Sequence, residues 1–272
     1  MSGTHPLDAA VNPEDPNLNG APPPEPRAIL RLPQRPPLVV YTLLAITVVV
    51  YLAQTLTGLG LLQVAGLRCP YFNSPDLPAC YGLKVNELII EGQWWRLVTP
   101  ILLHASLLHI GFNMYALYVL GPELESHFGH FPFLALYVLS GFAGVVLSFL
   151  MTESPSLGAS TAIFGLLAAQ GVFAYRNQRV FGRRARAALR SIINIALINF
   201  LIGLTPGIDN WGHFGGLLGG LIFAGMAAPS YEISAEGAEL RLANRTAPSR
   251  TILACIAVVL VFSGLAFWRA RQ

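Results

Sequence analysis

The sequence has few charged residues for its length. Asp, Glu, Lys and Arg make up 11% of the 272 residues, and 54% of the residues are hydrophobic. Soluble domains carry roughly 25% charged residues, and a soluble fold of this size has no means of hiding so much apolar surface. The composition therefore indicates a protein whose solvent is largely lipid. No Lys/Arg patch with interleaved aromatic residues is present, which argues against a nucleic-acid partner.

Cysteine is also scarce. Cys69, Cys80 and Cys255 are the only three, and none belongs to a CxxC pair or a Cys/His cluster with metal-ligand spacing. The sequence therefore predicts neither a metal site nor another cofactor. Residues 1–36 are rich in proline, asparagine and acidic side chains and lack the apolar region of a signal peptide. We expect a disordered tail there, since this composition buries too little apolar surface to offset the entropy of ordering.

Long apolar stretches dominate the remainder. Seven of them approach the ~20 residues that a helix needs to cross the hydrocarbon core. They are Leu38–Thr57, Ile101–Gly121, Phe131–Met151, Gly158–Tyr175, Leu189–Leu204, Trp211–Ala228 and Thr251–Trp268. The pattern predicts an all-α, polytopic membrane protein with three parts after the tail: a six-helix core at 37–228, a cytoplasmic linker at 229–250 and an additional transmembrane helix at 251–272.

The basic residues predict the orientation. Six arginines lie between the fourth stretch and the first residues of the fifth, at positions 176, 179, 183, 184, 186 and 190. Because cytoplasmic loops are enriched in basic residues, we expect this connection and the N-terminus in the cytoplasm. The start of the sequence does not resemble a transit peptide, which favours a bacterial plasma membrane. The segment Gly58–Pro100 then lies outside, where disulfides can form. Cys69 and Cys80 fall in this segment, and either a bridge between them or two free thiols is compatible with the sequence.

Polar side chains inside the apolar stretches are the candidate functional residues, since such groups are costly in lipid. His109 and Asn113 stand four apart in the second stretch, Ser160 opens the fourth, and His213 opens the sixth. Taken singly, each is explained by helix–helix packing or interhelical hydrogen bonds. In the predicted orientation, however, these three helices run in the same direction, so all four side chains lie at a similar depth. Unrelated packing residues would scatter, and we therefore expect a single site.

The residue types indicate nucleophilic catalysis. A serine hydroxyl becomes a good nucleophile when a neighbouring base removes its proton, and His213 is the best-placed base. Glycines 212, 216 and 220 form one small face around it and glycines 215 and 219 a second, which allows other helices to approach closely. The backbone N–H of Ser160, with His109 and Asn113, is expected to hold an oxyanion.

Two further residues have expected roles near the dyad. Phe164 follows the serine by one helical turn and is expected to pack against the imidazole. Asp209 precedes the histidine by four residues at the mouth of its helix. We interpret it as a helix cap rather than a third catalytic residue, which leaves a Ser–His dyad.

At these positions the sequence resembles the rhomboid family of intramembrane serine proteases. The resemblance covers about Leu38–Ala228 and combines five motifs. They are WWRLVTP; HxxxxHxxxN, formed by His104, His109 and Asn113; LGPELESHFG; GAS with IFG around Ser160, which includes Gly158; and GHFGGLLGG around His213.

The resemblance implies a six-helix core with a Ser–His dyad and an Asn/His oxyanion site, supported by His104, Phe164 and Gly158. It also implies a membrane-embedded first loop containing Trp95 and Arg96. The expected activity is endoproteolysis of single-pass membrane proteins in the bilayer, near the outer end of their membrane helix. The seventh stretch resembles that of the six-plus-one variant of the family.

One departure leaves an alternative open. Many active members have glycine directly after the serine, whereas this sequence has Thr161. A β-branched side chain there could hinder close helix packing, so a proteolytically silent module that holds membrane proteins is the second hypothesis. A transporter is a third, but the sequence has no visible inverted repeat and no charged residue near the predicted midplane.

Overall fold

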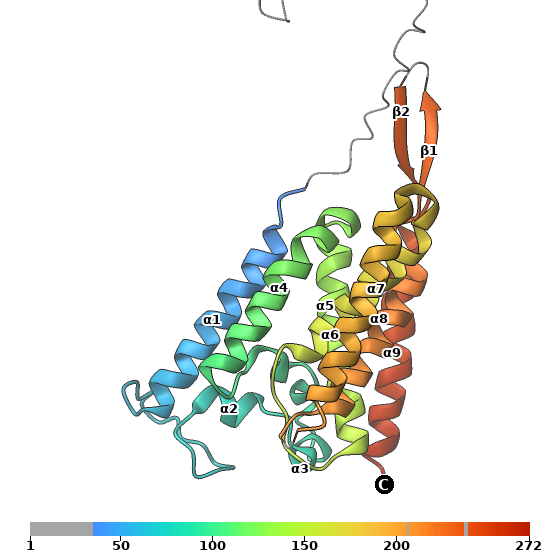
Figure 1. Cartoon of the computed structure of the whole chain (residues 1–272). Coiled ribbons are helices and arrows are strands. Elements are labelled where there is room, and N and C mark those ends of the chain that lie inside the picture. Colours follow the sequence, from blue (N-terminus) through green and yellow to red (C-terminus); the bar gives the residue numbers. More distant parts are fainter. Residues whose placement is uncertain (1–34, 206, 237–238) are drawn as a thin grey trace, which may run out of the picture.

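The computed structural model describes residues 35–205, 207–236 and 239–272. Within them, long helices form a bundle and a two-stranded hairpin lies at one end of it (Figure 1). The long helices are α1 (Leu38–Gly58), α4 (Leu107–Phe128), α5 (His130–Met151), α6 (Ser160–Arg176), α7 (Gln178–Ile202), α8 (Asn210–Ala227) and α9 (Ser249–Arg269). Short helices α2 (Leu77–Gly82), α3 (Asn86–Ile90), η2 (Trp94–Leu97) and η3 (Thr99–Leu102) belong to the first loop, residues 59–106, at the opposite end.

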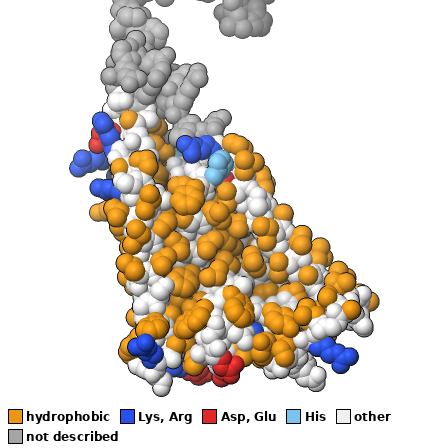
Figure 2. Space-filling view, turned by 180° about the vertical axis from the view of Figure 1, so that it is seen from behind, with side chains coloured by type: hydrophobic (Ala, Val, Ile, Leu, Met, Phe, Trp, Pro, Cys, Tyr) orange, Lys and Arg blue, Asp and Glu red, His pale blue; other side chains and the backbone are white. Residues whose placement is uncertain are grey.

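The surface has the character expected of a membrane protein. Hydrophobic side chains cover the middle of the face in Figure 2, and charged side chains gather at its two ends. Among the described helices, α1, α5, α7 and α9 are long and apolar enough to cross a membrane. The prediction of a helical membrane fold is thus confirmed in its class. A core of six membrane-spanning helices with one additional helix stays a prediction, because α4, α6 and α8 are not among the helices that are long and apolar enough to cross.

Glycines place α8 directly against α5 and α6. A Cβ on Gly216 would lie 2.0 Å from the carbonyl oxygen of Thr161, and one on Gly220 would lie 2.4 Å from that of Gly165. On the second face, a Cβ on Gly215 would lie 2.7 Å from the carbonyl oxygen of Ala143. The two glycine faces read from the sequence therefore pack against two different helices. This close backbone packing positions the start of α8 beside the start of α6.

A buried carboxylate joins α4 to the start of α1. Glu125 is fully buried, and its two oxygens accept hydrogen bonds from the backbone N–H groups of Val39 and Val40, each at 2.8 Å. The first N–H groups of a helix have no intrahelical partner, so this carboxylate satisfies two of them. His130 contacts the same carboxylate, with 2.5 Å between Nδ1 and Oε1. Both oxygens of the buried carboxylate are therefore hydrogen-bonded.

Three predicted boundaries were wrong. The second helix begins at Leu107 rather than Ile101, because residues 99–102 form η3 and Ser106 caps α4 through the N–H of His109. It also continues beyond Pro122 to Phe128. The connection predicted as an arginine-rich loop is the first half of α7, with a break in helical geometry at Gly182, where φ is 54°.

The segment predicted as a linker contains a β-hairpin. Strand β1 (Tyr231–Glu236) pairs antiparallel with β2 (Glu239–Asn244), with Tyr231 opposite Asn244 and Glu236 opposite Glu239. The hairpin is anchored to the helices by Asn177, whose side-chain oxygen accepts the N–H of Tyr231 at 2.8 Å. The described chain is thus mostly helical rather than purely α.

Candidate active site

The structure brings Ser160 and His213 together. Ser160 is the first residue of α6 and His213 the fourth of α8, and the Oγ and Nε2 atoms are 2.9 Å apart. Their backbones approach this closely because α8 presents its glycine face to α6. The distance is that of a hydrogen bond, so a neutral imidazole is placed to accept the hydroxyl proton.

The imidazole is held in its orientation by an aromatic ring and not by a carboxylate. Phe164 stacks on His213 with 4.3 Å between ring centroids and 14° between planes. Asp209 caps α8 as predicted, since its Oδ1 accepts the N–H of Gly212 at 2.8 Å. Among the described residues, Nδ1 of His213 is buried and has no hydrogen-bond partner. The arrangement is therefore a Ser–His pair.

Gly158 allows a histidine to approach the start of α6. Its φ is +129°, a conformation that favours glycine, and a Cβ there would lie 2.8 Å from Nε2 of His109. The ring of His104 lies 5.0 Å from that of His109, and its Nε2 is 3.5 Å from the N–H of Ala159. Both predicted histidines are thus neighbours of the residues that precede Ser160, although His104 lies before α4 and not on it.

Asn113 is buried on the same helix as His109. Its side-chain N–H group donates to the carbonyl oxygen of His109 at 3.0 Å, a bond within α4 and not between helices. An amide group carries two N–H hydrogens, and among the described residues the second has no recorded acceptor. The interhelical bond that a pure packing role requires is thus not found among these contacts.

Thr161 fits its surroundings because two neighbouring helices have glycine opposite it. The side chain is buried, and a Cβ on Gly144 of α5 would lie 2.6 Å from Cβ of Thr161. A Cβ on Gly212 of α8 would lie 3.1 Å from its Cγ2. The extra bulk is therefore accommodated without moving α8 away from α6. Gly144 was not predicted from the sequence, although it lies in a run of small residues, SGFAG, that is typical of close helix packing.

The first loop is held together by a disulfide and a buried arginine. Cys69 and Cys80 are bonded, which decides between the two alternatives that the sequence left open. Arg96 is fully buried, and its guanidinium donates to the carbonyl oxygens of Leu83 and Cys80, each at 2.7 Å. Trp95 donates through its ring N–H to the carbonyl oxygen of Tyr81 at 2.9 Å. These bonds define the loop geometry over the site end of the bundle.

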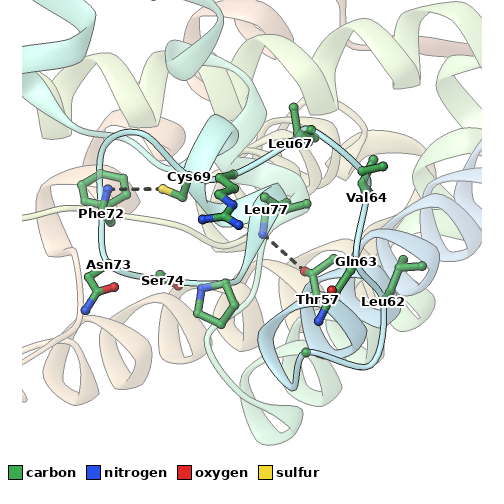
Figure 3. Close-up of a pocket in the computed structure, with 15 residues that line it drawn as sticks. Thr57, Leu62, Gln63, Val64, Leu67, Cys69, Phe72, Asn73, Ser74 and Leu77 are labelled. Atoms are coloured by element: carbon green, nitrogen blue, oxygen red, sulfur yellow. Dashed lines mark hydrogen bonds between the residues drawn. The ribbon is translucent and has the colours of Figure 1, made fainter.

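A hollow of about 590 Å³ lies within this loop and is not the site (Figure 3). It is lined by residues between Thr57 and Leu77, and it contains neither member of the Ser–His pair. A hydrogen bond of 3.3 Å from the N–H of Leu77 to Oγ1 of Thr57 ties the loop to α1 across it. Within the described part of the chain, no group of three His, Cys, Asp or Glu residues has the geometry to hold a metal ion.

Comparisons with known proteins identify a family. Residues 91–230 match the model of the Rhomboid domain. The chain is 39% identical over 186 residues to Rhomboid protease GluP of Bacillus subtilis (strain 168), covering 68% of this chain and 34% of GluP. It is 33% identical over 166 residues to RHOMBOID-like protein 9, chloroplastic, of Arabidopsis thaliana, covering 60% of this chain and 38% of that protein.

A third relative is matched over more of its own length. RHOMBOID-like protein 5 of Arabidopsis thaliana is 36% identical over 180 residues, which cover 64% of this chain and 58% of the relative. The chain therefore spans less than two thirds of the length of each of these three proteins. The Ser–His pair, His109, Asn113 and η2 all lie within residues 91–230, the range that matches the Rhomboid domain.

Proposed function

The chain belongs to the rhomboid family and is a membrane protein, and on this premise we propose that it is an intramembrane serine endopeptidase with Ser160 as nucleophile and His213 as base. One observation carries the proposal: the 2.9 Å distance between Ser160 Oγ and His213 Nε2 at the first turns of two adjoining helices. The name of GluP, Rhomboid protease, supports the same activity.

The proposed reaction has two steps. His213 removes the hydroxyl proton through Nε2 while Oγ of Ser160 attacks the carbonyl carbon of the scissile peptide bond. The tetrahedral intermediate collapses when the imidazolium gives its proton to the leaving amine, and an acyl-enzyme remains. Water, deprotonated by the same imidazole, attacks the acyl carbon. The second tetrahedral intermediate collapses as the imidazolium returns this proton to Oγ of Ser160, and the acyl fragment leaves with a new carboxyl terminus.

The negative charge on the oxygen of the tetrahedral intermediate is stabilised by hydrogen-bond donors that are already in position before the reaction. The N–H of Ser160 belongs to the first turn of α6, so it has no intrahelical acceptor. His109 borders Gly158, two residues before the nucleophile. Asn113 lies one turn further along α4, and its second side-chain hydrogen meets no acceptor in the part of the chain that the structure describes. These three groups are the proposed oxyanion site.

The proposed substrates are single-pass membrane proteins, cleaved in the bilayer near the outer end of their membrane helix. The test uses the full chain in liposomes with a model single-pass protein and a fluorophosphonate probe. We expect cleavage of the model protein and a covalent adduct on Ser160, located by mass spectrometry. A correctly folded chain that neither reacts with the probe nor cleaves would contradict the proposal and favour a silent module that holds membrane proteins.

The proposed orientation has the site end outside the cell and the arginines of α7 in the cytoplasm. Gln63 and Arg184 are both exposed side chains, one in the first loop and one on α7. In a Cys255→Ala background, the only other cysteines are those of the disulfide. We expect Gln63→Cys to react with a membrane-impermeant maleimide in intact bacterial cells, and Arg184→Cys to react only after permeabilisation. The reverse pattern would overturn the orientation.

A further inference from the structure

The chain has a single lysine, and this lysine is buried. Lys and Arg together number 17, of which 16 are arginine and only Lys84 is lysine. It lies between α2 and α3 in the first loop and has 0% exposure. A buried ammonium is costly unless it is hydrogen-bonded and charge-balanced, so its contacts should reveal what this side chain does.

All recorded hydrogen bonds of Lys84 go to the segment that precedes the nucleophile. This segment, the connector, comprises residues 152–159 between α5 and α6. The ammonium donates to the carbonyl oxygens of Thr152 at 2.6 Å and Ser154 at 3.0 Å. The backbone of Lys84 exchanges two further bonds with Ser156, at 3.1 and 3.2 Å. One residue of the first loop therefore grips three alternate residues of the connector.

The surrounding charges favour retention of the ammonium. Burial lowers the pKa of Lys84 from 10.5 to about 8, while Asp209, Glu153 and Glu87 act in the opposite direction and Arg269 adds to the lowering. At neutral pH the group thus keeps its positive charge and its three N–H donors. An ammonium is a compact point charge, which suits two carbonyl oxygens two residues apart.

The connector in turn determines where α6 begins. No side chain caps α6, whose first residue is Ser160. Just before it, the N–H of Gly158 donates to the carbonyl oxygen of Pro100 in the first loop at 2.9 Å, and the N–H of Ala159 lies 3.5 Å from Nε2 of His104. A shift of the connector would therefore move the nucleophile relative to His213, and a displacement of about 1 Å can cost about 10²-fold in rate.

We propose that Lys84 is a positioning residue that fixes Ser160 at the correct distance from His213 by clamping the connector to the first loop. The inference rests on the proposed serine-protease function. It explains why the chain retains a buried ammonium at a point where the backbone pairing with Ser156 would be available to any residue.

The test compares Lys84→Met with the parent. The substitution keeps the length and apolar stem of the side chain but removes the donors to both carbonyl oxygens. In the folded fraction we expect kcat and the rate of fluorophosphonate labelling at Ser160 to fall by about 10- to 100-fold, with KM changed by less than about twofold. Amide hydrogen exchange in the connector should become faster. Arg68→Met is the matched control, because it removes an exposed cation from the same loop and should leave all three measurements unchanged.

A purely structural role gives a different result. Lys84→Met would then lower the melting temperature while its folded fraction kept the parental kcat and labelling rate, and this would overturn the proposal. If Lys84→Met does not fold, Lys84→Gln decides the question, since its side chain ends in a polar group but is one atom shorter than the lysine that reaches the carbonyl oxygens of Thr152 and Ser154. Lys84→Gln should lower kcat at constant KM, and a parental kcat would overturn the proposal. A folded parent that is not labelled contradicts the serine-protease function itself, whereas a labelled parent with an equally active Lys84→Met contradicts only the role of Lys84.

Discussion

Ser160→Ala and His213→Ala each lower the turnover of a model membrane substrate by about 10⁴–10⁶-fold, and the double variant is little worse than either. This is the expected result if the two side chains act as one unit, because the imidazole has no proton to take once the hydroxyl is gone. Conversely, the hydroxyl is a weak nucleophile without the base. Turnover is measured in liposomes, with the folded fraction checked by thermal melting in detergent.

Ser263→Ala is the matched control for this pair. Ser263 is an exposed serine of α9, away from the site, so its loss removes the same hydroxyl without touching the dyad and should leave turnover at the parental value. Robust cleavage by Ser160→Ala would remove the proposed mechanism. Strictly multiplicative losses in the double variant would show instead that the serine and the histidine act independently.

Asn113→Ala lowers turnover by about 10²–10³-fold, in line with the loss of a single oxyanion donor in other serine hydrolases. KM changes little, because the donor interacts mainly with charge that develops in the transition state. Little stability should be lost, since the recorded hydrogen bond of Asn113 runs to His109 in its own helix. The paired measurements are the melting temperature in detergent and kcat on one substrate.

Asn199 offers a control of the same geometry. Its side-chain N–H group donates to the carbonyl oxygen of Ile195, four residues earlier in α7, at 2.8 Å. Asn199→Ala therefore removes an equivalent bond away from the dyad and should leave kcat unchanged. If Asn113→Ala is destabilised by ~0.6 kcal/mol, the average for interhelical hydrogen bonds in membranes, and has normal kcat per folded molecule, Asn113 is a packing residue. The proposal that His109 donates to the oxyanion would then be weakened as well, because Asn113 is its neighbour in the proposed donor set.

Sequence patterns were informative where one helix meets another. The spacing of Gly212, Gly216 and Gly220 predicted a close approach to a neighbouring helix, and their backbones meet Thr161 and Gly165 of α6. Glycine spacing is readable because a small residue has one dominant purpose inside a membrane bundle. Chain direction alone predicted that Ser160 and His213 lie at the same end of their helices, and the two side chains meet there.

The patterns failed where a polar residue has a distant partner. The apolar stretch ended at Gly121, yet α4 continues for another two turns because Glu125 bonds to the first amides of α1. The local sequence does not predict that a carboxylate is buried when its hydrogen-bond partners lie more than 80 residues away. The role of Lys84 was not predicted for a similar reason. Its acceptors are backbone carbonyl groups of the connector, and since every residue has such a group, the sequence does not indicate which ones accept.

The hairpin, by contrast, had a local signal. Tyr231 and Ile233 alternate with polar residues in β1, and Leu240 and Leu242 do so in β2. This period of two predicts strands. The long apolar stretches did not indicate the hairpin, because each strand has only six residues and half of them are polar.

The Cys69–Cys80 bond determines when the first loop can be completed during biosynthesis of the protein. In the proposed orientation the thiols can be oxidised only after the first loop has crossed the membrane, whereas the helices can insert and pack earlier. Arg96 donates to the carbonyl oxygen of Cys80, so the fold of the loop is linked to closure of the bond. Newly inserted chains would thus pass through a reduced stage in which the bundle is assembled but its loop is unfinished.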